Sequence, residues 1–266
     1  CSDAGYKGIE LGPVGFMPED PEILGDALEK FDLELIGGVV FRAYHDEKQW
    51  EDVLDGTHRT CQALVAHGAK HLVLIDSISE RRAPTAGRVN EAEQMSKEEW
   101  SSYRERITTS ARIGAEEYGL TVGIHAHAAG FMDFEPELER LLSEVDEEIL
   151  KICFDTGHHS YAGFDPVEFM QKYISRISYM HFKDIDPKVK QKVLDNRTGF
   201  YDACGQGIFC NLGDGDVDFP TVRKILLENN FEGWCTVEQD CDPLLDPNPL
   251  SDAQLNREYL ETIGFK

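Results

Sequence analysis

The sequence is short of positive charge. Its 26 lysines and arginines stand against 50 aspartates and glutamates, which gives a formal net charge of −24. Because nucleic acids and anionic membrane surfaces are bound through clustered cations, this balance argues against both as partners. The sequence also lacks an apolar run of the ~18 residues that a membrane span needs, and it shows no signal peptide. These features predict a cytoplasmic protein.

Motifs of several common protein classes are missing as well. The seven cysteines are odd in number and include no CxxC pair, which favours reduced thiols over disulfides or a zinc–thiolate site. No GxGxxG, GK[ST] or GxSxG segment occurs, so a nicotinamide cofactor, a P-loop and an esterase-type nucleophile have no support. The glycine-rich segment 207–219 lacks EF-hand spacing and is interpreted as a turn that leads into a helix.

What the sequence does contain is a regular alternation of apolar strands and amphipathic helices. This alternation is typical of a parallel sheet, and 266 residues match the ~250 residues of one α/β barrel. We therefore predict a single (β/α)8 TIM barrel domain over residues 1–266. The predicted strands cover 6–11, 34–41, 70–76, 120–126, 150–155, 177–183 and 233–239. The predicted helices cover 21–31, 47–67, 97–118, 135–145, 166–175, 219–229 and 251–262.

Seven predicted strands are one fewer than a closed eight-stranded barrel needs. The chain begins at Cys1, directly before the first of them. We predict that a first strand lies upstream of Cys1. The alternative is a naturally incomplete barrel, which would leave unprotected strand edges. Two long connections, residues 77–96 and 184–218, are predicted to be functional lids.

Polar side chains end six of the seven predicted strands. Because all strand carboxyl ends of a parallel barrel meet on one face, these side chains are expected to converge. One of them, Asp76, is interpreted as structural. The full set comprises Glu10, Asp76, His125 with His127, Asp155 with His158, His181 with Lys183, and Glu238 with Asp240.

Four of these residues are the strongest candidates for a metal site. They are His125, Asp155, His181 and Glu238. A set of two imidazoles and two carboxylates suits one divalent ion (Mn²⁺, Co²⁺, Fe²⁺, Mg²⁺ or Zn²⁺) with positions open for a substrate. Such a metal would stabilise an enediolate, formed when a proton leaves the carbon next to a carbonyl. His125 and His127 are predicted to face opposite sides of the strand if it is regular, so that only one of them is a direct ligand without a bulge, and His125 is favoured.

The residues beside these ligands are candidates for proton transfer. We predict Lys183 or His127 as the base and His158 as the acid. In the alternative, Lys183 only forms an ion pair with Asp184 or Asp155 and does not touch the substrate. The predicted substrate contacts are Glu10, which orients hydroxyls, His158, Lys183 and Asp240.

Several segments carry a resemblance to a known family. HxH at 125–127, DTGHHSYAGFDP at 155–166, ISYMHFKDID at 177–186 and EGWCTVEQD at 232–240 resemble the xylose-isomerase-like TIM barrels. Within that superfamily the chain is most similar to the inosose dehydratase (2-keto-myo-inositol dehydratase) family of inositol catabolism. Three further segments narrow the resemblance to that family: KDIDPKVKQKVLDNRTGFYDACGQGIF (183–209), NLGDGDVDFPTV (211–222) and EQDCDPLLDPNPLSDAQLNREYL (238–260).

The resemblance implies a lyase of carbohydrate metabolism that uses a divalent metal, with Mn²⁺ or Co²⁺ favoured. The implied reaction removes water from a keto-inositol, or a similar keto-polyol, through a metal-stabilised enolate. A ketose or sugar-phosphate isomerase or 3-epimerase of the same superfamily is the alternative. A catalytically inactive sugar-binding relative is a third reading. The sequence leaves the oligomeric state open, a homo-oligomer included.

Family positions carry over residue by residue. The implied metal ligands are Asp155, His181 and Glu238. His158 matches a substrate-contacting histidine, and Lys183 matches the lysine of an HxKD motif. His125 stands where the epimerases carry a glutamate, which weakens a symmetric two-glutamate mechanism and suits a dehydratase. The chain departs from the family at AAGF (128–131), where HMGT is usual, and at Leu212, where proline is usual.

Overall fold

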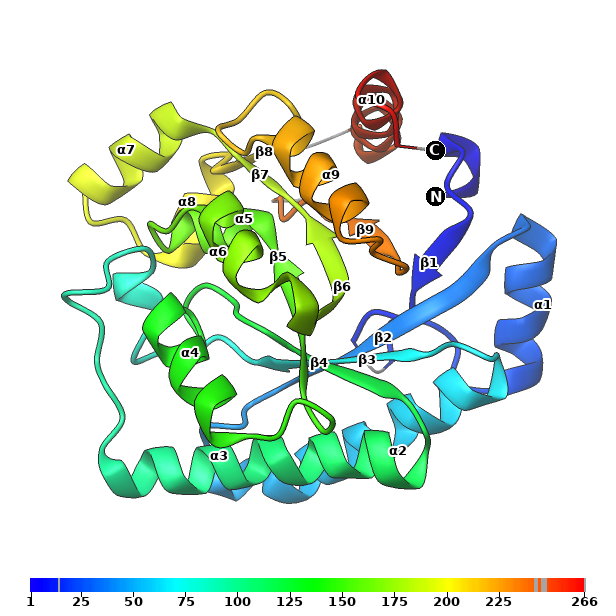
Figure 1. Ribbon diagram of the computed structural model, residues 1–266, viewed down its shortest axis with the longest axis horizontal. Coiled ribbons are helices and arrows are strands. Elements are labelled where there is room, and N and C mark those ends of the chain that lie inside the picture. Colours follow the sequence, from blue (N-terminus) through cyan, green and yellow to red (C-terminus); the bar gives the residue numbers. More distant parts are fainter. Residues whose placement is uncertain (14, 242–243, 245–247, 266) are drawn as a thin grey trace.

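The main sheet of the protein is a parallel barrel wall with one gap. The computed structural model describes residues 1–13, 15–241, 244 and 248–265. Within these residues, seven parallel strands follow the order β1-β2-β3-β4-β5-β6-β9 and curve around a common centre (Figure 1). They are β1 (Gly8–Glu10), β2 (Glu34–Arg42), β3 (His71–Asp76), β4 (Thr121–His125), β5 (Lys151–Asp155), β6 (Ile177–Phe182) and β9 (Cys235–Val237). The predicted TIM-barrel architecture is confirmed.

Helices surround this wall on its outer side (Figure 1). The α-helices are α1 (Pro21–Phe31), α2 (Trp50–Ala66), α3 (Lys97–Arg112), α4 (Glu135–Glu144), α5 (Thr156–Tyr161), α6 (Pro166–Tyr173), α7 (Pro187–Asp195), α8 (Phe200–Gly205), α9 (Phe219–Glu228) and α10 (Pro249–Thr262). Short 3-10 turns cover Ser2–Ala4, Glu47–Gln49, Ala83–Thr85 and Ile174–Arg176, and a π turn covers Ile113–Glu117. In the described part of the chain, no helix is long and apolar enough to cross a membrane.

Capping side chains explain where many of these helices begin. The Ser96 hydroxyl accepts from the Glu99 amide, while the Glu99 carboxylate accepts from the Ser96 amide, which forms a capping box at the start of α3. Asp165 accepts from the first amides of α6, and Asp20 does the same for α1. Each of these aspartates precedes a proline at the first helical position, which favours helix initiation.

The connection over residues 184–218, predicted as one long loop, is partly folded. It contains α7, α8 and a two-stranded antiparallel ladder of β7 (Asp184–Ile185) with β8 (Phe209–Cys210). Asp184 organises this segment, because its carboxylate accepts from the amides of Ile185, Gly213, Gly215 and Val217. The helix α5 was also missed. All six of its residues are buried, so the sequence has no amphipathic period there.

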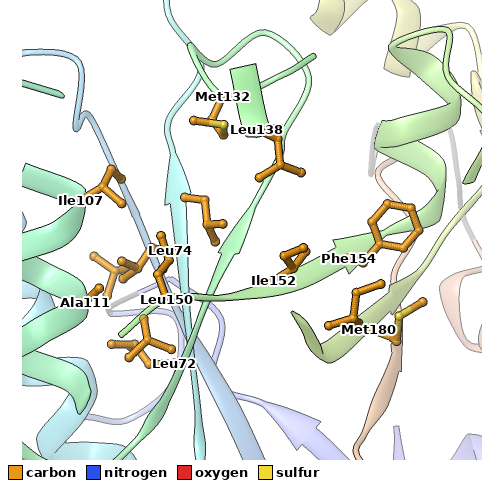
Figure 2. Packing of buried hydrophobic residues seen from close by; sticks show 14 of the residues in the cluster. Leu72, Leu74, Ile107, Ala111, Met132, Leu138, Leu150, Ile152, Phe154 and Met180 are labelled. Atoms are coloured by element: carbon orange, nitrogen blue, oxygen red, sulfur yellow. The ribbon is translucent and has the colours of Figure 1, made fainter. Parts of the chain in front are cut away.

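Two layers of apolar side chains hold the barrel together. The larger layer lies between the strands and the outer helices, and Figure 2 shows part of it, with Leu72 and Leu74 of β3 beside Ile107 and Ala111 of α3. The smaller layer fills the barrel interior with Ile36, Val39, Val73, Ile75, Cys153 and Tyr179. Cys153 is 1% exposed and packs there as a small hydrophobic residue.

The two edge strands, β1 and β9, approach each other without pairing in the described part of the chain. Between them lies a cleft of about 710 Å³. Glu10 and Glu238 both line this cleft, so it reaches the carboxyl ends of the strands. The strand predicted upstream of Cys1 stays a prediction.

Candidate metal and proton-transfer site

Four side chains from neighbouring strands meet at one end of the barrel. His125, Asp155 and His181 are the last or next-to-last residues of β4, β5 and β6, and Glu238 directly follows β9. Their ligand-type atoms all lie within 4.8 Å of one another. His125 Nε2 is 3.4 Å from Asp155 Oδ2, and His181 Nδ1 is 3.3 Å from Glu238 Oε2. The structure thus brings together the four residues that the sequence predicts as metal ligands.

The polar atoms of this cluster fit a cation better than they fit one another. His181 Nδ1, which faces Glu238, is buried and has no hydrogen-bond partner among the described residues. Buried polar groups without partners are rare in proteins and mark a missing ion or water. Two imidazoles and two carboxylates, without a thiolate, are a donor set for a divalent transition-metal ion.

The protonation states of His125 and Asp155 agree with this fit. Burial lowers the pKa of His125 to about 4, although Asp155 opposes the shift, so the imidazole is neutral. Burial would raise the pKa of Asp155, but the Lys183 ammonium and the His158 ring outweigh burial and hold this pKa well below the usual range. Neutral imidazole and ionised carboxylate are the forms that bind metals.

His181 lies between two carboxylates. Its Nε2 is 3.2 Å from Glu10 Oε2, and its Nδ1 faces Glu238. Burial would lower the pKa of His181, but the nearby Cys153 sulfur and the carboxylates of Glu238 and Glu10 outweigh it and hold the pKa well above the usual range. The surroundings therefore favour positive charge at this point. Glu10 stands behind the ring, where outer carboxylates commonly hold a metal-binding histidine.

A second cluster adjoins the first. His127, His158 and Asp240 also offer ligand-type atoms within 4.8 Å of one another. The Lys183 ammonium lies among them, 3.0 Å from both Asp240 Oδ2 and His158 Nε2. Because this space already holds a side-chain cation, the second cluster is suited to substrate binding and proton transfer rather than to a second metal ion.

The ring of His127 points toward the site, contrary to the prediction that His125 and His127 face opposite sides. Their ring centroids are 5.7 Å apart, and the ring of His127 packs against that of His158 at a tilt of 40°, with centroids 4.0 Å apart. The prediction was wrong because side chains two residues apart in an extended chain point to the same side, and His127 follows the last residue of β4, His125, at this spacing. Phe200 of α8 packs at 5.6 Å against His127, which places the 184–218 segment over the site.

The backbone of Ala128 fixes opposite tautomers on this pair of histidines. His127 Nδ1 lies 2.8 Å from the Ala128 carbonyl, which can only accept, so this nitrogen carries the proton. The Ala128 amide, which can only donate, lies 3.2 Å from His158 Nδ1, so that nitrogen is unprotonated. In the neutral rings, Nε2 of His127 is therefore an acceptor and Nε2 of His158 is a donor. The Lys183 ammonium, 3.0 Å from His158 Nε2, cannot accept from it, so both groups direct their protons at Asp240 Oδ2.

Lys183 is fully buried among carboxylates. Its Nζ is 3.0 Å from Asp240, 3.3 Å from Glu238 and 3.5 Å from Asp155. Burial would lower its pKa, but these carboxylates outweigh burial and hold the pKa well above the usual range. Of the two ion pairs in the alternative interpretation, the one with Asp155 is present, whereas the Asp184 carboxylate is occupied by backbone amides.

Asp76 holds loops rather than facing the cluster. Its Oδ1 lies 2.8 Å from His45 Nδ1, and its Oδ2 accepts from the Phe131 amide at 2.8 Å. These contacts support the structural interpretation of Asp76. Sequence reasoning missed the backbone of Ala128 and the buried carboxyl of Asp133, which accepts from the Ala129 amide. An acidic residue within the apolar run FMDF was the only signal for the latter.

Gly157 of α5 is expected to tolerate no side chain. A Cβ atom there would lie 2.6 Å from Cγ of Lys183 and 3.0 Å from its backbone carbon. We expect Gly157→Ala to lower the free energy of unfolding by ~1–3 kcal/mol through overpacking and to displace Lys183. Chemical denaturation measures the change. The matched control is Gly205→Ala, where nothing lies within 4 Å of the added atom, and it should stay within about 0.5 kcal/mol of the parent. Equal stability of the two variants would contradict the close packing.

A nearly closed parallel β/α barrel with its polar cluster at the strand carboxyl ends belongs, as a class, to the TIM-barrel enzymes. Comparison with known families narrows this class. Residues 1–263 match the family described as xylose isomerase-like TIM barrel, and the chain belongs to this family. The predicted family is thereby confirmed.

Individual relatives agree with the family. The chain is 32% identical over 263 residues to an inosose dehydratase of Clostridium botulinum, a match covering 97% of this chain and 85% of the relative. Among solved structures, the probable 3-DHS dehydratase AsbF of Bacillus anthracis has a TM-score of 0.73 at 18% identity, covering 98% of this chain and 90% of that chain. The IOLI protein with a bound zinc atom has a TM-score of 0.74 at 17% identity, covering 99% and 90%. These two likenesses confirm the fold.

Proposed function

We propose that the protein is a hydro-lyase that removes water from a keto-inositol (inosose) or a similar keto-polyol in the cytoplasm. The curated relative from Clostridium botulinum supports the substrate class. The observation that carries the proposal is the pair of adjacent histidines, His127 and His158, held in opposite tautomers beside the four-ligand cluster. Dehydration needs one group that takes a proton and another that gives one. A symmetric epimerisation, by contrast, uses two equivalent groups on opposite faces of the substrate, one of which removes a proton while the other returns one.

In this proposal His127 is the base. Its Nε2 has a free lone pair when Nδ1 donates to Ala128. Burial, followed by the neighbouring rings of His158 and His125, holds the pKa of His127 well below the usual range, so the ring is neutral and ready to accept a proton. The proton comes from the carbon next to the substrate carbonyl. Lys183, the other predicted base, is favoured instead as an ammonium donor to a substrate oxygen, because three carboxylates surround it.

His158 is the acid that protonates the departing hydroxyl. Its Nε2 carries the proton and lies 3.4 Å from Asp240 Oδ2. Asp240 also accepts from Lys183, so it aligns both donors. Since the Asp240 side chain is 39% exposed, it is the member of this group that is placed to bind a substrate hydroxyl as well.

The four-ligand cluster is proposed to hold one divalent ion. His125, Asp155, His181 and Glu238 would hold it, with Glu10 fixing the ring of His181 from behind. When bound, the ion supplies Lewis-acid stabilisation of the negative charge of an enolate. The family resemblance favours Mn²⁺ or Co²⁺, and Zn²⁺ is the ion named for the IOLI structure.

Product analysis tests the proposed reaction. Purified protein is incubated with 2-keto-myo-inositol and Mn²⁺ in deuterated water, and the products are followed by ultraviolet absorption and mass spectrometry. We expect an enone-type absorption and a product lighter by one water. Exchange of substrate hydrogen for deuterium without loss of water would instead indicate an isomerase or epimerase. Binding of the substrate without either change would indicate an inactive sugar-binding relative.

A further inference from the structure

One peptide group links a buried carboxyl to the proposed base. The peptide between Ala128 and Ala129 receives a hydrogen bond from His127 Nδ1 on its carbonyl, at 2.8 Å. The amide of the same peptide donates to Asp133 Oδ2, at 3.0 Å. Carboxyl, peptide and imidazole thus form a continuous hydrogen-bonded chain. Hydrogen bonds in such a chain polarise and strengthen one another.

The backbone at this peptide is held in a costly conformation. Ala129 has φ +69°, the left-handed region that a residue with a Cβ atom rarely adopts. Both of its polar backbone groups are fixed, because the amide donates to Asp133 and the carbonyl accepts from the Ser79 amide at 2.9 Å. A strained residue that its surroundings hold so firmly points to a functional requirement.

The Asp133 carboxyl makes few other interactions. Its side chain is buried, and its Oδ1 has no hydrogen-bond partner in the part of the chain that the structure describes. The nearby Arg82 guanidinium is engaged by the Glu137 carboxylate, at 2.9 Å. Burial raises the pKa of Asp133 to about 7 against the opposing effects of Arg82 and the Ala129 amide. In either protonation state Oδ2 can accept from this amide.

We infer that Asp133 is a positioning residue for His127, which it orients through the Ala128–Ala129 peptide. By holding the Ala129 amide, Asp133 keeps the Ala128 carbonyl directed at His127 Nδ1 and keeps the proton of the neutral ring on that nitrogen. The neighbouring Ala128 amide is directed at His158 Nδ1 by the same turn. The inference rests on the proposed function for its catalytic meaning, but the tautomer of His127 is a property of the protein alone.

Nitrogen NMR of the histidine rings provides the test. Metal-free protein with ¹⁵N-labelled histidine is compared for the parent, Asp133→Asn and Asp133→Val, and the His127 signals are assigned by their loss in His127→Gln. The parent and Asp133→Asn, which keeps an acceptor oxygen, should show the Nδ1–H tautomer of His127. Asp133→Val should show a mixture of tautomers. With the metal-loaded protein and 2-keto-myo-inositol, kcat of Asp133→Val should fall ~10–100-fold, as on loss of an outer hydrogen bond, with KM little changed.

Asp76→Asn is the matched control, since that carboxylate holds the Phe131 amide of the same turn but not the peptide next to His127. It should leave the His127 tautomer unchanged. If Asp133→Val does not fold, Asp133→Ala removes the same acceptor without added bulk and should give the same tautomer mixture. An unchanged His127 tautomer in Asp133→Val or in Asp133→Ala would overturn the inference. A parent protein that fails to dehydrate the substrate would refute the proposed function but leave the NMR result decisive for Asp133.

Discussion

The Asp155→Ala, His181→Ala double variant is expected to purify without bound divalent metal and to lose measurable dehydration. These two residues are paired in register on β5 and β6 and contribute one carboxylate and one imidazole to the four-ligand cluster. Removing both leaves only His125 and Glu238, which are too few ligands for a stable site of this type. Elemental analysis of purified protein, together with the product assay, measures both effects.

Matched controls separate this effect from a general loss of acidic charge. Asp165→Ala and Asp218→Ala remove helix-capping carboxylates from outside the cluster. Each substitution is expected to lower the free energy of unfolding by ~1 kcal/mol, and each variant should contain as much metal as the parent. Equal metal content in the parent and in the double variant would contradict the ligand assignment.

His127→Gln is expected to lower kcat by ~10²-fold or more while metal content stays normal, because general base catalysis contributes about this much. His158→Gln should lower kcat by a similar factor, because it removes the acid that protonates the departing hydroxyl. Lys183→Met should also lose activity, since its ammonium aligns Asp240 beside His158. Steady-state kinetics with metal at saturation, and elemental analysis in parallel, measure these changes.

The pH profile distinguishes the two candidate bases. Because burial and the neighbouring histidines lower the pKa of His127, the parent rate should hold through mildly acidic pH and fall only as the pH drops below the usual histidine range. His127→Gln should lose this acidic limb, whereas Lys183→Met should retain it. His58→Gln, on the outer helix α2, is the control and should behave as the parent. An acidic limb that disappears in Lys183→Met but persists in His127→Gln would assign the base to Lys183.

The grouping of His125, Asp155, His181 and Glu238 could be predicted from the sequence because the carboxyl ends of the strands can be recognised there. An apolar run followed by a histidine or carboxylate, as at Asp155 and His181, places that side chain on the carboxyl face of a parallel barrel. The strand alternation and the family segments together indicated the fold. The members of the cluster could therefore be named from the type of side chain at each strand end and from the order of strands along the chain.

The proton-transfer group could be predicted only in part, because backbone groups control it. The tautomers of His127 and His158 depend on where the amide and carbonyl of Ala128 point, and that direction depends on the left-handed turn at Ala129. Turns of this kind leave no periodic pattern in a sequence. The direction of His127 was predicted incorrectly for a different reason: residues two apart in an extended chain lie on the same face, so His127 follows His125 toward the site.

Metal titration of chelator-treated protein tests the central claim most directly, namely that His125, Asp155, His181 and Glu238 form a one-ion centre that dehydration requires. The metal-free protein is titrated with Mn²⁺ while the enone product from 2-keto-myo-inositol is followed. We predict no product before addition and a rate that rises in proportion to bound Mn²⁺ until one ion per chain is reached. Full dehydration by the metal-free protein would contradict the claim.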